Sequence, residues 1–226
     1  MPFSFIKNLL PDHPVPTRIL RGPFRGAVIV MNPRDSLRKV FGVYEHELNS
    51  WIEEALRRVN RVLDVGANDG YFTFGCAAAF RRLGKAGSII SFEPQPDMTL
   101  QESLKTQNSD GIKIEIIQKF VGRSTDKEMM ISLDDVPITD KKNTLVKIDV
   151  EGAEIDVIAG AASWMDASNL FLIEVHQQPF LKVINEQFAA RGHKLKQLDQ
   201  RPIPVLGREN RSESNYWLVS DLNACS

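Results

Sequence analysis

The chain has 226 residues, of which 42% are hydrophobic and 25% are charged, and its formal net charge is −1. This size and balance fit one compact α/β domain with a modest appendage, and they give no overall attraction to nucleic acid or anionic lipid. The two cysteines, Cys76 and Cys225, form neither a metal-binding spacing nor a disulfide framework. The start has no signal-like apolar stretch, and no later run approaches a membrane span. We therefore expect a soluble, cytoplasmic protein that binds no nucleic acid and has no membrane span.

The first 59 residues are predicted to form an N-terminal cap. They contain a proline-rich start, two short alternating segments at 18–20 and 27–31, and a helical pattern from Glu45 to Val59. Tyr44 and Glu45 come at the start of that helix. As part of the cap, they are candidates to fold over a bound ligand.

Apolar strands alternate with helices in residues 60–222, and residues 223–226 form a short tail. Strands are predicted at 61–65, 88–93, 112–118, 144–150 and 170–175, with helices at 71–83, 97–107, 153–159 and 180–191. This alternation indicates a parallel sheet covered by helices on both faces. Two further strand-like runs, 193–198 and 215–220, have no helix between them, so the last strand should insert antiparallel.

Polar residues gather where the predicted strands end. In an open sheet of this kind, ligands bind beyond the carboxyl ends of the strands, where the strand order switches. The residues at these ends are Asp64 with Gly66, Glu93, Asp149 with Glu151, and Glu174 with His176. A single acidic strand end is commonly a solvated terminus or a helix cap. Four such ends on one rim indicate a ligand site.

The turn from Gly66 to Gly70 narrows the type of ligand. Its second glycine is misplaced for a dinucleotide fingerprint, and Asp64 and Asp69 would repel a diphosphate. S-adenosylmethionine carries a sulfonium and an ammonium and has no phosphate, so nearby carboxylates favour it. Glu93, which closes the second strand, can accept both hydroxyls of a ribose. The alternative for the glycine turn is a packing role alone.

Four segments, "VLDVGANDGYFT", "SFEPQPD", "LVKIDVEGAEIDVIAGA" and "LFLIEVH", resemble the FkbM-like family of S-adenosylmethionine-dependent methyltransferases in order and spacing. The resemblance extends from about Ile19 to Ser220. It implies the class I methyltransferase fold, a Rossmann-like sheet of seven strands with the last antiparallel. It also implies S-adenosyl-L-methionine as cofactor and O-methylation of a hydroxyl on a sugar, glycolipid or polyketide-type metabolite, so the partner would be a small-molecule or glycan acceptor.

The resemblance also implies roles for single residues. Those that match the donor turn are Asp64, Gly66, Ala67, Asn68 and Gly70, and Glu93 matches the ribose acid. The motif beside the transferred methyl is matched by Asp149, Glu151, Gly152 and Glu154. Phe120 and Val121 are candidates to pack on the adenine. The acid that often follows them in such enzymes is not matched at its usual place, since Asp126 lies further along.

A hydroxyl acceptor requires a base, and His176 is the histidine predicted at a strand end on this rim. Asp149 is the rival base. Asp149, Glu174 and His176 would also suit Mg²⁺ or a plain hydrogen-bond network, and no metal is assigned to them.

Two other classes of protein stay open: a non-catalytic module that binds S-adenosylmethionine, and an oxidoreductase on a Rossmann sheet. The connection from Asp199 to Asn215 is long for a compact domain, and it is either a wall of the acceptor pocket or a solvated flexible loop. Its arginines, Arg201, Arg208 and Arg211, would then face an anionic or sugar acceptor. No pattern indicates the oligomeric state.

Overall fold

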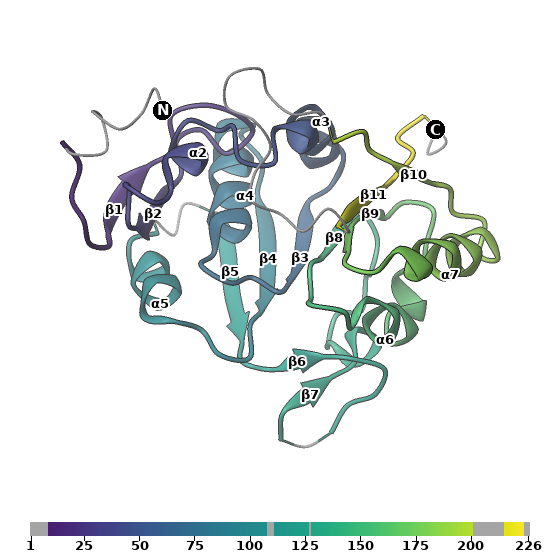
Figure 1. Ribbon diagram of the computed structural model, residues 1–226. Helices are drawn as coiled ribbons and strands as arrows, with labels where there is room; N and C mark the ends of the chain where they lie inside the picture. Colours follow the sequence, from purple (N-terminus) through teal and green to yellow (C-terminus); the bar gives the residue numbers. More distant parts are fainter. Residues whose placement is uncertain (1–8, 108–110, 127, 201–214, 224–226) are drawn as a thin grey trace.

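The computed structural model describes residues 9–107, 111–126, 128–200 and 215–223 (Figure 1). Its centre is a seven-stranded sheet with the order β10-β11-β9-β8-β3-β4-β5. The strands of this sheet are β3 (Arg61–Val65), β4 (Gly87–Phe92), β5 (Ile112–Ile117), β8 (Thr144–Ile148), β9 (Leu170–Val175), β10 (Leu195–Gln197) and β11 (Tyr216–Ser220). The loop predicted to line the acceptor pocket, with its three arginines, lies outside the described residues.

Strand direction follows the sequence prediction. The pairs β3–β4, β4–β5, β3–β8 and β8–β9 are parallel, whereas β11 pairs antiparallel with both β9 and β10. Numbered in chain order, these seven strands lie as 3-2-1-4-5-7-6, which is the class I methyltransferase arrangement and confirms the predicted fold class. The chain moves outward from β3 to β5 and then returns to β8 on the other side of β3. The strand order therefore switches between β3 and β8, where a ligand site is expected.

The helices cover both faces of the sheet. They are α2 (Leu37–Val40), α3 (Asn49–Arg58), α4 (Tyr71–Arg82), α5 (Met98–Lys105), α6 (Glu154–Ala159) and α7 (Gln178–Ala189), with short 3₁₀ turns η1 (His46–Leu48), η2 (Leu133–Asp135) and η3 (Ala162–Trp164). The stretch predicted as one helix from Glu45 is thus η1 followed by α3. At α5, the Asp97 side chain accepts the Leu100 amide at 2.8 Å, which is a standard N-cap.

The core divides into two hydrophobic clusters, one on each face of the sheet. Val62 belongs to the first cluster and its neighbour Leu63 to the second, because successive side chains of a strand point to opposite faces. The first cluster contains α4 together with the apolar residues of α3, among them Trp51. The second contains residues of α6 and α7. Parallel strands buried on both sides account for the continuous apolar runs in the sequence.

The cap is packed into the first cluster. Its two strands, β1 (Val15–Arg18) and β2 (Val28–Met31), pair antiparallel. Ile19, Phe24 and Ile29 are buried beside α4, and the Trp51 indole donates to the Ser220 carbonyl at 3.0 Å. The segment before residue 60 therefore shares its core with the sheet. Two further short strands, β6 (Phe120–Val121) and β7 (Met130–Ile131), pair parallel outside the main sheet.

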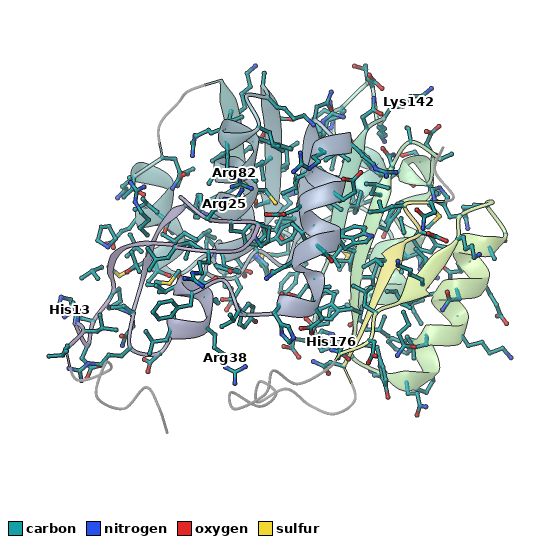
Figure 2. The ribbon with its side chains drawn as sticks, turned by 90° about the horizontal axis from the view of Figure 1, so that it is seen from above. His13, Arg25, Arg38, Arg82, Lys142 and His176 are labelled. Atoms are coloured by element: carbon teal, nitrogen blue, oxygen red, sulfur yellow. The ribbon has the colours of Figure 1, made fainter. Side chains whose placement is uncertain are left out.

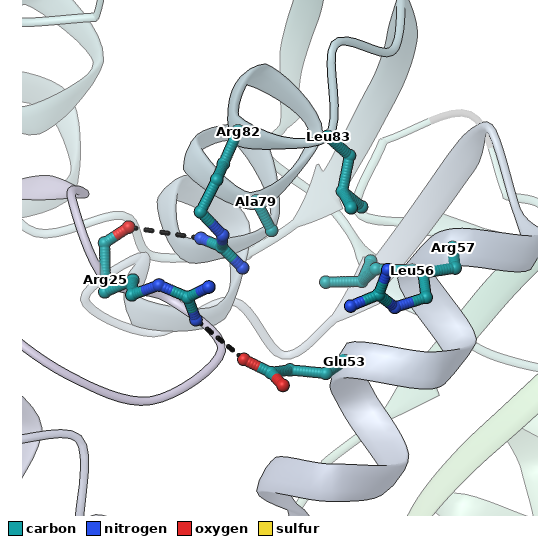
Figure 3. A pocket seen from close by; sticks show the side chains of 7 residues that line it. All are labelled: Arg25, Glu53, Leu56, Arg57, Ala79, Arg82 and Leu83. Atoms are coloured by element: carbon teal, nitrogen blue, oxygen red, sulfur yellow. Dashed lines mark hydrogen bonds and ion pairs between the residues drawn. The ribbon is translucent and has the colours of Figure 1, made fainter.

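A polar cavity of about 180 Å³ lies between α3, the end of α4 and Arg25 (Figure 3). Because α4 returns from the carboxyl end of β3, its last turn is at the amino ends of the strands, away from the switch point. Figure 2 likewise shows Arg25 and Arg82 apart from His176. Arg82 of α4 donates to the Pro23 carbonyl at 2.9 Å, which joins the cap to the domain, and Arg25 pairs with Glu53 at 2.8 Å within the cap. None of the described helices is long and apolar enough to cross a membrane.

Candidate active site

The turn after β3 lies directly against the end of β8. Gly66 has φ +80°, and a Cβ built on it would stand 1.9 Å from the Asp149 carbonyl oxygen. The Asp149 amide donates to the Val65 carbonyl at 3.0 Å, which holds the two strand ends together. The sequence analysis gave Gly66 a ligand-binding role. In the structure, a side chain does not fit at Gly66, because the backbone carbonyl of Asp149 occupies the space that its Cβ would need.

Asp64 lies beneath this turn and is fully buried. One carboxylate oxygen accepts the Thr73 hydroxyl at 2.6 Å, and the other lies 3.1 Å from the ammonium of Lys147. Lys147 is also buried and reaches Asp149 at 3.2 Å and the Gly66 carbonyl at 2.9 Å. A lysine of β8 thus joins the ends of β3 and β8. Asp64 therefore acts from below the turn and does not present its charge to a ligand.

The pKa values of this group reflect burial and pairing. Burial raises the pKa of Asp64, since an ionised carboxylate is poorly solvated there. For Lys147, burial alone would lower the pKa, but Asp149 and Asp64 together raise it well above its usual range. For Asp149, burial would raise the pKa, and the Lys147 ammonium brings it below the ordinary value. We therefore take Lys147 as charged and Asp149 as an ionised carboxylate.

The second acid of the turn is paired as well. Asp69 forms an ion pair with Lys39 of α2, and its other carboxylate oxygen accepts the Tyr71 amide at 3.1 Å. The sequence analysis expected Asp64 and Asp69 to make the turn negative. In the structure, Asp64 pairs with Lys147 and Asp69 with Lys39, so a lysine partly offsets the charge of each acid.

Glu93 lies where a ribose acid is expected. Its two carboxylate oxygens accept the amides of Asn68 at 2.9 Å and Gln95 at 3.1 Å. Each carboxylate oxygen has two lone pairs, so both can accept a further hydrogen bond from a pair of hydroxyls. Asn68 takes the left-handed backbone conformation (φ +50°) that brings its amide to Glu93. Gly70 ends the turn with φ +82° and begins α4, and Ala67 is buried within it.

The two adenine candidates differ in exposure. Val121 is buried in the second hydrophobic cluster, whereas Phe120 leaves 47% of its surface exposed. Phe120 follows β5, and the Ile117 carbonyl at the end of β5 accepts the amide of Glu93. Of the two residues, Phe120 is therefore the one with exposed surface on which an adenine ring could pack. Asp126 uses one carboxylate oxygen to accept three backbone amides of its own loop, from Glu128, Met129 and Met130.

A group of titratable side chains stands beside the turn at the ends of β8 and β9. One potential ligand atom from each of Asp149, Glu174 and His176 lies within 4.8 Å of the others, so the structure brings together the three residues that the sequence suggested. His176 Nδ1 is 2.6 Å from a carboxylate oxygen of Glu154, which is fully buried. Figure 2 shows His176 toward the edge of the molecule. The hydrogen bond that His176 donates to Glu154 raises the pKa of His176 against the lowering effect of burial, and the nearby Glu174 adds to the rise.

Three partners in this site were missed by sequence analysis. Lys147 had a signal, because it is a charge in an otherwise apolar strand and shares a face with Asp149, two residues on. Lys39 gave none, since nothing in a cap sequence indicates which residue of the domain it contacts. Glu154 was matched to a motif. Its contact with His176, 22 residues away, could not be read from spacing.

Comparisons with known proteins were made for the whole chain. Residues 103–195 match the family described as "Methyltransferase FkbM domain". No curated protein matches the chain.

Solved structures with a similar course of the chain include precorrin-6y C5,15-methyltransferase from Geobacter metallireducens, with 11% identity and a TM-score of 0.48 over 75% of this chain and 86% of that one. The C-terminal domain of precorrin-6Y C5,15-methyltransferase from Rhodobacter capsulatus has 18% identity and a TM-score of 0.47 over 74% and 83%. TYW2 of P. horikoshii in complex with MeSAdo has 13% identity and a TM-score of 0.47 over 87% and 67%.

The strand order, the turn at the switch point and the match of residues 103–195 agree with one another. S-adenosylmethionine is the cofactor of this family and fold. Residues 103–195 are thus similar to the FkbM methyltransferase domain, and the sheet has the strand order of the class I S-adenosylmethionine-dependent methyltransferase fold.

Proposed function

We propose that the protein transfers a methyl group to a hydroxyl oxygen of a small-molecule or glycan acceptor, with His176 as the base. The observation that carries the proposal is the contact of His176 Nδ1 with buried Glu154, at 2.6 Å, beside Asp149. A carboxylate only accepts hydrogen bonds, so Nδ1 donates and Nε2 is left to accept a proton. This is the tautomer that a general base requires.

The donor residues of the proposed site are Glu93 for the ribose, Phe120 for the adenine and the turn from Gly66 to Gly70 for the methionine part. When bound, S-adenosylmethionine supplies an electrophilic methyl group. The acceptor must be held in line with that methyl, so positioning accounts for much of the rate. Asp149 lies at the switch point beside the turn, which suits it to orient the acceptor hydroxyl.

His176 is preferred to Asp149 as the base on electrostatic grounds. Lys147 keeps the pKa of Asp149 below its ordinary value, so Asp149 is a weak proton acceptor. Glu154 acts in the opposite direction on His176 and makes it a stronger base than free imidazole. The proton of the acceptor hydroxyl would pass to His176 Nε2 as the bond from the acceptor oxygen to the methyl carbon forms and the bond from that carbon to the donor sulfur breaks, with its electron pair left on the sulfur.

His176→Ala should reduce kcat by about 100- to 10,000-fold, the range of a general base, while leaving donor affinity nearly unchanged. In the wild type, kcat should rise with pH through the pKa of His176. The base must be deprotonated and this pKa is raised, so the rise should be centred above the ordinary value of 6.5. Methyl transfer to a panel of sugar, glycolipid and polyketide-type acceptors is measured with isotope-labelled donor, and donor binding by calorimetry.

Two controls accompany this measurement. Glu154→Gln retains the size of the side chain and should shift the kinetic pKa of His176 downward, since its amide is uncharged. Protein treated with a metal chelator should retain activity, because the proposed base needs no metal. Full activity of His176→Ala on the same acceptor would assign the proton transfer elsewhere, and loss of activity on chelation would favour a cation at Asp149, Glu174 and His176.

A further inference from the structure

Lys39 of the cap lies at the beginning of α4, beside the turn that follows β3. Its ammonium pairs with Asp69 and lies 5.1 Å from the ring centroid of Tyr44 and 5.3 Å from that of Tyr71. The two rings meet edge to face with centroids 5.6 Å apart. One ammonium is thus held by a carboxylate and two aromatic faces. The Lys39 side chain keeps 19% of its surface exposed, so it can still contact a ligand.

Two features at this point suit an anionic group. The Lys39 ammonium has three N–H donors, so its pair with Asp69 leaves it able to donate to a second oxygen, and α4, a helix of 12 residues, adds the partial positive charge of its N-terminus at Tyr71. Lys147 at the other end of the turn is also charged, and its ammonium lies over the ring of Phe72 at 5.6 Å. Lys147 is held by Asp64 and Asp149 with 7% of its side chain exposed, so Lys39, at 19%, is the more accessible of these two ammonium groups.

The donor has one anionic group, the carboxylate of its methionine part. Glu93 stands at the end of β4, whereas Asp149 and Lys147 stand on β8, and these two strands flank β3 on opposite sides. A donor with its ribose on Glu93 therefore extends its methionine end across the turn, toward α4 and the cap.

We propose that Lys39 binds the carboxylate of S-adenosylmethionine, so that the N-terminal cap completes the donor site. Asp69, Tyr44 and Tyr71 fix the position of its ammonium before the donor arrives. This inference rests on the donor site proposed above. It adds a binding residue from a segment that precedes the matched region, residues 103–195, by more than one strand and helix.

The test compares two donors with two lysine variants by calorimetry. Decarboxylated S-adenosylmethionine lacks the carboxylate and keeps the sulfonium, ribose and adenine. In the wild type it should bind about 10-fold or more weakly than S-adenosylmethionine, since a hydrogen bond between charged groups is lost. In Lys39→Met, S-adenosylmethionine should lose the same factor, while the decarboxylated donor should bind as it does to the wild type. Lys39→Arg should recover part of the discrimination.

The matched control is Lys182→Met on α7, whose side chain is 82% exposed and distant from the turn. It should bind both donors as the wild type does. If Lys39→Met weakens both donors equally, the lysine only holds the cap in place and the inference is wrong. Equal binding of both donors by the wild type would also overturn it. Failure of the wild type to bind S-adenosylmethionine would instead reject the donor site itself.

Discussion

At the scale of single residues, buried Lys147 is the main link between the strands that form the site. It contacts Asp64 at 3.1 Å, Asp149 at 3.2 Å and the Gly66 carbonyl at 2.9 Å, so its one ammonium has three oxygen partners from two strands. The partner Asp64 is fully buried and would be a costly charge without it. The Lys147 ammonium thus allows the Asp64 carboxylate to be buried under the donor turn.

Lys147→Met should destabilise the protein by about 3–5 kcal/mol, because it leaves Asp64 buried without a counter-charge. Urea denaturation followed by circular dichroism measures this loss. The loss should shrink when Asp64→Asn is combined with Lys147→Met, since the uncompensated charge is then removed. A loss below about 1 kcal/mol in the single variant would mean that water or another group solvates Asp64.

The same residues mark the limit of sequence reasoning. Asp64, Glu93, Asp149 and His176 could be located because parallel strands place their carboxyl ends on one rim, a rule that needs only strand order. Their partners could not be located. Lys147 is 83 positions from Asp64, and Asp69 meets a lysine of the cap, contacts that depend on side-chain packing between elements. The lysines that offset the acids of the turn were missed for this reason.

At the scale of elements, the turn from β3 to α4 is fixed by the backbone of β8. The strands and helices predicted from the sequence agree well with the structure. The reason is that buried parallel strands give long apolar runs, and polar or small residues separate one run from the next. Sequence analysis assigned the glycine of the turn to the ligand. The structure adds a packing requirement at that glycine, so its replacement should also cost stability, and its role toward the ligand stays a prediction.

Gly66→Ala should destabilise the fold by about 2–5 kcal/mol, combining the strain of a left-handed non-glycine residue with the overpacking of its Cβ on Asp149. Gly84→Ala is the matched control. Gly84 has φ +64°, and a Cβ on it would meet nothing within 4 Å, so that variant carries the backbone strain alone. Its cost should be about 1–2 kcal/mol by the same urea titration.

Donor binding separates the two glycine variants further. Gly84→Ala should bind S-adenosylmethionine as the wild type does, whereas Gly66→Ala should bind it weakly even at temperatures where the chain is folded. In Gly66→Ala, the added Cβ should displace the end of β8, which moves Asp149 away from the turn. Equal stability of the two variants would show that the ends of β3 and β8 can separate without cost.

At the scale of the whole molecule, the cap and the sheet form one core. Phe24 packs edge to face on Tyr71 and Phe72 of α4, with centroids 5.1 and 5.5 Å apart, and Trp51 of α3 bonds to the last strand. The sequence indicated a change of pattern near residue 60. It did not indicate that the segment before this point covers one face of α4.

A chain that begins at residue 60 should therefore fail to fold cooperatively. Without the cap, the face of α4 that packs on Phe24 and the apolar surface that α3 covers would be exposed, and exposed apolar surface favours association. Size-exclusion chromatography, binding of a hydrophobic dye and thermal unfolding by calorimetry compare this fragment with the full chain. We expect an aggregating fragment that binds dye and has no sharp transition.

The full chain with Trp51→Phe is the control for this deletion, because it removes only the indole hydrogen bond to Ser220 and keeps an aromatic ring in the core. It should retain a cooperative transition at a slightly lower Tm, since one hydrogen bond contributes about 0.5–1.5 kcal/mol. A soluble fragment 60–226 with its own sharp transition would show that the sheet and its remaining helices bury enough surface alone. In that case the cap would serve the donor site without being required for the fold.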